Sequence, residues 1–159
     1  MIITRRFILM FALMFWQGGF MFYGAVTVPI VRARLGPGPE RSLITQRVTQ
    51  WMNLAGTVAI LAMFADVWAS PIQRKRWRWV AWLAMALPQP IVIILHRVLS
   101  GQMAAAGFHS SETSGFLAWH QVYLMLNSIQ WIGGMAFAVL SLRAWREEDR
   151  SLAARNSAN

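Results

Sequence analysis

Four long apolar runs with almost no charge constrain this chain more than any other feature. Residues 7–31, 79–95 and 116–142 carry no Asp, Glu, Lys or Arg, and residues 48–69 carry only Asp66. About 20 residues of helix cross the roughly 30 Å hydrocarbon core of a bilayer. A single helix also satisfies its own backbone hydrogen bonds in lipid, which an isolated strand cannot do. The sequence therefore predicts an all-α integral membrane four-helix transmembrane bundle.

The limits of the apolar runs give the expected boundaries of the helices. We expect transmembrane helices at residues 7–31, 48–70, 79–99 and 117–143, followed by a short tail over residues 144–159. The linkers are too short to separate two domains and no segment repeats, so residues 1–159 are predicted to form a single membrane domain. Seven of the nine tryptophans lie near a predicted helix end, where amphipathic indole rings meet the lipid headgroups. They are Trp51, Trp68, Trp77, Trp79, Trp82, Trp119 and Trp145.

The distribution of basic residues predicts the orientation of the bundle. The chain is 57% apolar yet has a formal net charge of +9. Ten of its 15 Lys and Arg fall at the ends that carry the two termini and five at the opposite ends, which favours cytoplasmic termini. A basic rim facing anionic lipid explains this charge without nucleic acid. Only Lys75 among the 15 is a lysine, a bias typical of GC-rich bacterial genomes, so the predicted location is a bacterial plasma (inner) membrane.

Amide and hydroxyl side chains inside the apolar runs predict where the helices meet. Such groups hydrogen-bond between helices in a membrane, and small residues let the backbones approach each other. The expected buried polar residues are Gln17, Asn53, Thr57, Gln89, Asn127 and Gln130. The glycines expected to permit tight helix contact are Gly18, Gly19, Gly56, Gly133 and Gly134.

Two histidines raise the possibility of a cofactor. His96 and His120 each lie about four residues inside the same predicted face of the bundle, on helices joined by a short loop. Two imidazoles at matched depth could ligate a b-type haem or a metal ion, or relay protons to a quinol. His109 in that loop could be a third ligand. The alternative is that both histidines form interfacial hydrogen bonds, since no recognised ligand spacing is present.

Asp66 and Gln89 raise a different possibility, small-solute transport. Asp66 is the only acid inside a predicted span, one turn from its end, where Arg74, Lys75 or Arg76 could form an ion pair with it. Gln89 lies between two prolines that should interrupt the third helix, and transporters use such interruptions as binding sites. Four helices leave little room for a pathway, so a transporter would have to be an oligomer.

The first and fourth apolar helices resemble those of a known family. Residues 15–36 contain Gly18-Gly19, Pro29 and a basic loop beginning at Arg32, and residues 119–131 contain His120 followed by Leu126-Asn127. This pattern is similar to the small four-helix membrane family that includes transmembrane protein 205. Gln17 before the glycines and the Trp-rich second loop depart from it. The resemblance implies four helices and a buried face between His120 and Asn127, and it implies no catalytic residues.

The loops hold no nucleophile, base and acid in a defensible arrangement, which favours a non-catalytic role. The Trp belts and the small residues within the spans indicate helix contacts in the membrane. The leading hypothesis is therefore an accessory or structural subunit of a larger membrane complex, with the lipid bilayer and other membrane subunits, or further copies of itself, as its partners.

Overall fold

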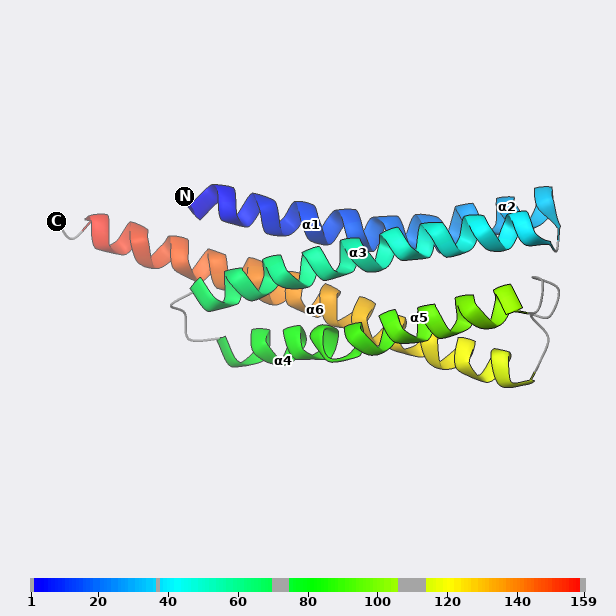
Figure 1. The fold of residues 1–159 in the computed structure, drawn as a ribbon. Coiled ribbons are helices and arrows are strands. Elements are labelled where there is room, and N and C mark those ends of the chain that lie inside the picture. The colour runs from blue at the N-terminus through cyan, green and yellow to red at the C-terminus, as the bar shows by residue number, and fades with distance from the viewer. Residues whose placement is uncertain (1, 37, 70–74, 106–113, 158–159) are drawn as a thin grey trace.

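The computed structural model describes residues 2–36, 38–69, 75–105 and 114–157, and these residues are almost entirely helical. The elements along the chain are α1 (Ile2–Phe22), the π-helix η1 (Tyr23–Thr27), α2 (Val28–Leu35), α3 (Pro39–Ala69), α4 (Lys75–Ala86), α5 (Pro88–Ala105) and α6 (Ser114–Ser157). Figure 1 shows them as long rods that lie roughly along one direction.

Four helical stretches are long and apolar enough to cross a membrane, as the sequence predicted. They are Ile2–Leu35, Pro39–Ala69, Arg76–Ala105 and Gly115–Ser157. The helices run beyond the apolar segments at most ends, and the last one covers nearly all of the predicted tail. The reason is that Arg, Glu and Ala favour helix outside lipid as well, so the backbone hydrogen bonds continue where the apolar run stops.

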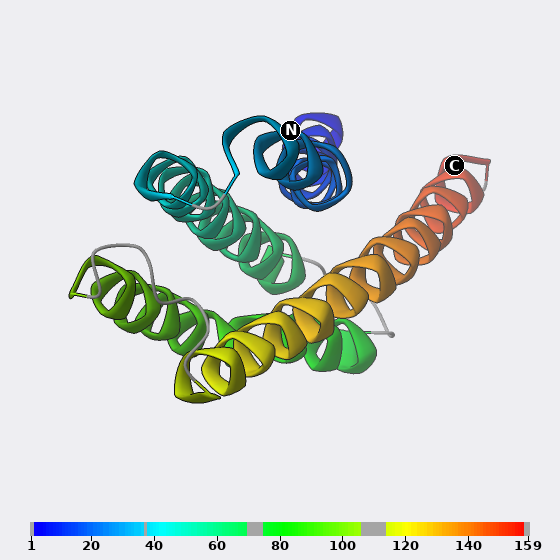
Figure 2. The same cartoon turned by 90° about the vertical axis from the view of Figure 1, so that its right-hand side faces the viewer.

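The helices form two antiparallel pairs. The helix α1–η1–α2 lies along α3, and α4–α5 lies along α6 (Figure 1). Both termini lie at the same end of the molecule, which we call the termini end. Viewed from the opposite end in Figure 2, α2 and the first turns of α6 lie apart, whereas α6 crosses towards α1 further away from the viewer. The two pairs therefore pack more closely towards the termini end.

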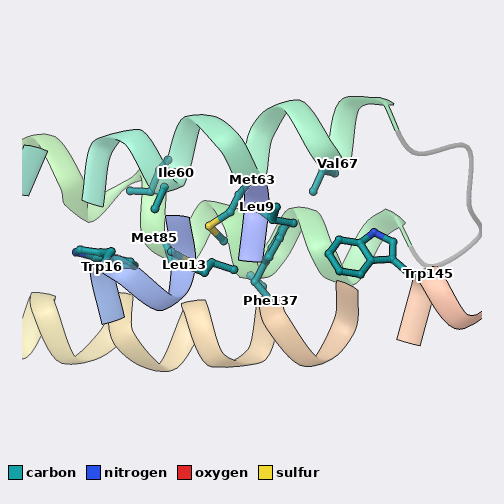
Figure 3. Packing of buried hydrophobic residues seen from close by; sticks show 11 residues of the cluster. Leu9, Leu13, Trp16, Ile60, Met63, Val67, Met85, Phe137 and Trp145 are labelled. Carbon is teal, nitrogen blue, oxygen red and sulfur yellow. The ribbon is translucent and has the colours of Figure 1, made fainter. Parts of the chain in front are cut away.

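The hydrophobic core is unequally divided along this axis. The larger cluster joins all four spans towards the termini end and includes Leu9, Trp16, Met63, Met85 and Phe137 (Figure 3). The smaller cluster consists of Val92, Leu95, Leu99 and Tyr123, which come from α5 and α6 alone. Buried apolar packing thus ties the four spans together at the termini end and only one pair of helices at the opposite end.

Prolines explain the two irregular points in the helices. Val28 donates its backbone N–H to the carbonyl of Tyr23, five residues back, which makes the π-turn of η1 directly before Pro29. Proline has no N–H to donate and its ring crowds the carbonyl four residues earlier, so the wider turn relieves that position. In the third span α4 ends before Pro88, with Leu87 as a turn residue that still donates to the Leu83 carbonyl at 3.0 Å. The predicted interruption of this span is confirmed.

Candidate functional site

A layer of uncharged polar side chains crosses the middle of the bundle. We define the polar layer as Asn53 and Thr57 of α3, Gln89 of α5 and Gln130 of α6. The Gln89 side-chain amide donates to the backbone carbonyl of Asn53 at 2.9 Å and to the Thr57 hydroxyl at 3.0 Å. The Gln130 amide donates to Gln89 Oε1 at 2.7 Å and to the Met85 carbonyl at 2.9 Å. Gln89 and Gln130 are both buried, so these bonds satisfy polar groups that lie away from solvent.

The interruption of the third span lies next to this layer. Pro88 and Pro90 have no N–H, so the carbonyls of Ala84 and Ala86, four residues before them, have no helical donor. The Met85 carbonyl, which lies between those two along the chain, accepts the bond from Gln130. The other two predicted polar residues bond elsewhere. Gln17 donates to the Trp131 carbonyl at 3.1 Å, which links α1 to α6, and Asn127 donates to the Tyr123 carbonyl of its own helix at 2.8 Å.

A cavity of about 390 Å³ lies between the two helix pairs on the side of the polar layer away from the termini, and we call it the α1–α6 cavity. Asn53, Gln89 and Gln130 lie at one end of it. The remaining lining residues come from α1, η1, α2, α3 and α6, and they include Trp16, Phe20, Tyr23, Val28, Arg41, Met52, His120, Tyr123 and Asn127. In the described chain neither η1 nor α2 contacts α6, and Figure 2 shows α2 and the first turns of α6 apart from each other.

A second cavity of about 660 Å³ lies between α3 and α5, and we call it the α3–α5 cavity. Its polar lining comprises Gln46, Arg47, Gln50, Asn53, Thr57, His96, Arg97 and Ser100, and its apolar lining comprises Leu43, Trp51, Leu54 and Ile93. Asn53 lines both cavities, so this one side chain forms part of the wall between them.

The structure places His96 and His120 in different surroundings. His96 is partly buried and lines the α3–α5 cavity, whereas His120 is more exposed, lines the α1–α6 cavity and stacks against Phe116 and Tyr123. His109 lies outside the described residues. Within the described ranges no three His, Cys, Asp or Glu side chains are grouped as metal ligands would be. A haem or metal role for His96 and His120 stays a prediction.

A cluster of charged side chains joins the helices at the termini end, and its residues are Arg5, Arg6, Asp66, Arg78, Glu148 and Asp149. Arg78 of α4 donates to Asp66 of α3, and both side chains are almost fully buried. Arg5 Nε lies 2.9 Å from the other oxygen of Asp66. We call these six residues the charge cluster.

The N-terminal arginines connect the charge cluster to α6. Arg6 donates to Glu148 at 2.8 Å and to Asp149 at 3.0 Å, and its guanidinium lies 5.4 Å from the centre of the Trp145 ring. Arg5 lies 3.9 Å from Glu148 as well. The guanidinium of Arg78 lies 5.3 Å from the Phe137 ring, which is also on α6. The cluster therefore ties α1, α3, α4 and α6 at one level.

Sequence reasoning found Asp66 but missed most of its surroundings. The partners that the described structure gives it are Arg78 and Arg5 rather than the neighbouring Arg76, while Arg74 and the side chain of Lys75 lie outside the described part of the chain. In the sequence, Arg78 is one of the ten basic residues that predict the orientation, and its charge alone does not indicate a buried partner. The signal that could have found it is the helical spacing of Arg78 from Ala81 and Met85, which places it on the buried face of α4.

Four of the five glycines expected at helix contacts are indeed crowded. A Cβ on Gly56 would lie 2.8 Å from Trp16 Nε1, and one on Gly133 would lie 2.9 Å from Met85 Cγ. Gly19 faces Met52, and Gly134 meets the Gln17 amide. Gly18 differs, because a Cβ there would meet nothing within 4 Å of it. The surface of α1 at Gly18 therefore faces away from the other helices of the bundle.

The comparisons with protein-family models, with curated proteins and with solved structures gave no match to this chain. The resemblance to the family that includes transmembrane protein 205 stays a prediction. Of the face that it implies, Asn127 is buried in the structure while His120 is exposed.

Proposed function

We propose that this chain is a multi-pass protein of a bacterial plasma (inner) membrane, with both termini in the cytoplasm. The four apolar helices supply the spans. The excess of Lys and Arg at the termini end supports the orientation, ten residues against five.

Within that membrane, we propose that the protein acts without catalysis as a subunit of a larger assembly. The observation that carries this proposal is a stripe on α1. The stripe consists of exposed residues on one face of this helix. Because successive residues of a helix are about 100° apart around its axis, these residues fall within a sector of about 120°. They are Ile3, Phe7, Phe11, Met14, Phe15, Gly18, Met21 and Phe22, all of them exposed.

The stripe has a shape that a second helix could fit. Phe7, Phe11 and Phe15 stack in succession, with ring centres 6.1 and 6.3 Å apart. Gly18 follows as a notch in the apolar surface, where a partner helix could approach the backbone closely. The span that contains α1 is also the least buried of the four. Within an apolar segment of 18 residues in each span, 17% is buried in this first span and 33–39% in the others.

Cross-linking through engineered cysteines tests this proposal cleanly, because the chain has no native cysteine. Met14 is 72% exposed on the stripe, and Leu61 of α3 is 61% exposed elsewhere, which makes it a matched control. In native membranes, Met14→Cys should give a specific cross-linked product and Leu61→Cys should give none. A product of twice the 18.1 kDa chain mass indicates a second copy, and any other mass indicates a different subunit.

A second variant tests the notch itself. Gly18→Leu should dissociate the complex extracted in mild detergent, whereas Gly101→Leu should leave it intact, since Gly101 also has open space around it. A monomer in native membranes and in detergent, with no cross-link through Met14→Cys, would overturn the assembly role.

A further inference from the structure

We infer that the α3–α5 cavity binds the phosphate-bearing headgroup of an anionic lipid, with the lipid chain lying along the inner part of the cavity. This inference uses the proposed membrane location but not the α1 stripe. The first argument is charge. Arg47 comes from α3 and Arg97 from α5, and both line the one cavity. None of its described lining residues is acidic, so the site has cationic groups and no fixed anion among them.

The second argument is the supply of hydrogen-bond donors around these cations. Gln46 Nε2 is buried and has no hydrogen-bond partner in the described structure. A buried donor of this kind is costly to leave unpaired. Gln50 and Ser100 also line the cavity and can donate, while His96 can donate through a ring nitrogen. A phosphate group offers the several acceptor oxygens that such a set of donors requires.

The third argument is depth, which separates a lipid from a soluble anion. Arg47 lies eight residues from the start of α3, and Arg97 lies eight residues from the end of α5. Both of these helix ends lie at the end of the bundle away from the termini, so each arginine is roughly 12 Å along the helix from that end. The cavity continues towards the termini end past Trp51 and Leu54 of α3 and Ile93 of α5. Cationic groups at the level of the headgroups followed by apolar walls match a molecule with an anionic head and a hydrocarbon chain.

The intact protein in a zwitterionic detergent provides the test. Fluorescence of the chain, which includes Trp51 in the cavity wall, is followed while mixed micelles of phosphatidylglycerol are added, and native mass spectrometry counts the lipids retained. The wild type should retain phosphatidylglycerol at least tenfold more tightly than phosphatidylcholine. The double variant Arg47→Gln/Arg97→Gln should lose this preference. Arg32→Gln/Arg34→Gln is the matched control, because both arginines are exposed on α2 near the same end and outside the cavity.

Each other outcome contradicts the inference. Equal retention of both lipids shows that the site does not select an anion, and an equal loss in both double variants shows a general surface effect. If millimolar inorganic phosphate displaces the lipid and also saturates the site when no lipid is present, the site binds the free anion and not a lipid headgroup. Since none of these readouts depends on a partner of α1, they separate this inference from the proposed assembly role.

Discussion

The two halves of this bundle are held together by different interactions. At the termini end, four spans share one hydrophobic cluster and are joined by buried or half-buried charges. Beyond the polar layer, the buried apolar cluster joins only α5 and α6, and two cavities separate the helix pairs. The comparison teaches that strong, specific polar contacts at one end permit open space at the other. A bundle closed by such contacts along its whole length would leave no room for a ligand.

Breaking the charge cluster should have the largest effect on stability. Arg78→Met leaves the fully buried Asp66 with Arg5 as its remaining ion-pair partner among the described residues, and removing one member of a buried pair costs about 3–5 kcal/mol. Arg76→Met, two residues away at an exposed position, should cost little. Unfolding in detergent, followed by circular dichroism, compares the two. Adding Asp66→Leu to Arg78→Met should recover much of the loss, and equal unfolding midpoints for both single variants would contradict a structural role for this pair.

Crowding the boundary between the halves should have the next largest effect. In Gly56→Ala the new Cβ would lie 2.8 Å from Nε1 and 3.0 Å from Cε2 of the rigid Trp16 ring, which also lines the α1–α6 cavity. Overpacking of this kind costs about 1–3 kcal/mol. Gly101→Ala has open space and should be neutral or slightly stabilising, because alanine favours helix over glycine. The same unfolding assay measures the stability of both variants. If Gly56→Ala is as stable as Gly101→Ala, the Trp16 ring moves aside without cost, which contradicts the predicted overpacking.

Removing one member of the polar layer should cost less. Gln130→Leu deletes the bonds to Gln89 and to the Met85 carbonyl, and interhelical bonds in membranes contribute about 0.6–2 kcal/mol each. We expect a total loss of about 1–2 kcal/mol because leucine supplies apolar contact in return. Gln121→Leu changes an exposed glutamine on the same helix and serves as the control. If the two variants unfold alike, the polar layer does not hold the halves together.

The outer edge of the charge cluster should contribute least. Glu148 is paired with Arg6, and both side chains are partly accessible, so Glu148→Gln should cost about 0.5–1 kcal/mol. Salt screens such pairs. Raising the ionic strength should therefore destabilise the wild type more than the variant. A wild type whose unfolding midpoint does not respond to salt would place the pair in surroundings that ions do not reach.

The sequence predicted the spans and the interrupted third helix because both depend on local composition. Runs without charge indicate membrane helices whatever their neighbours are, and Pro88 cannot donate a backbone hydrogen bond in any fold. The polar residues were found by type but not by partner. Gln89 bonds to Asn53, Thr57 and Gln130 only because α3 and α6 face α5 at that level, which depends on the rotation of each helix.

The charge cluster shows a further limit of sequence reasoning. The sequence around Glu148 is typical of a solvated helix end, since the neighbouring residues Arg146, Glu147, Asp149 and Arg150 are all charged. It is instead largely covered, because α6 continues as a helix and passes beside the first turns of α1. The cavities were beyond prediction for the same reason, as they arise where helix pairs diverge and not from any residue type.

The charge cluster also has a consequence for the order in which the chain is made. Its three arginines and three carboxylates cancel in formal charge, but Glu148 and Asp149 are synthesised after the other four residues of the cluster. Until then Asp66 is the only acid of the cluster that has been made, against its three arginines. In the proposed membrane topology the arginines would serve first as orientation signals, for which acidic residues matter little. The same side chains form the complete set of structural contacts only after the fourth span has been made, so the arrival of that span completes the charge cluster at the termini end.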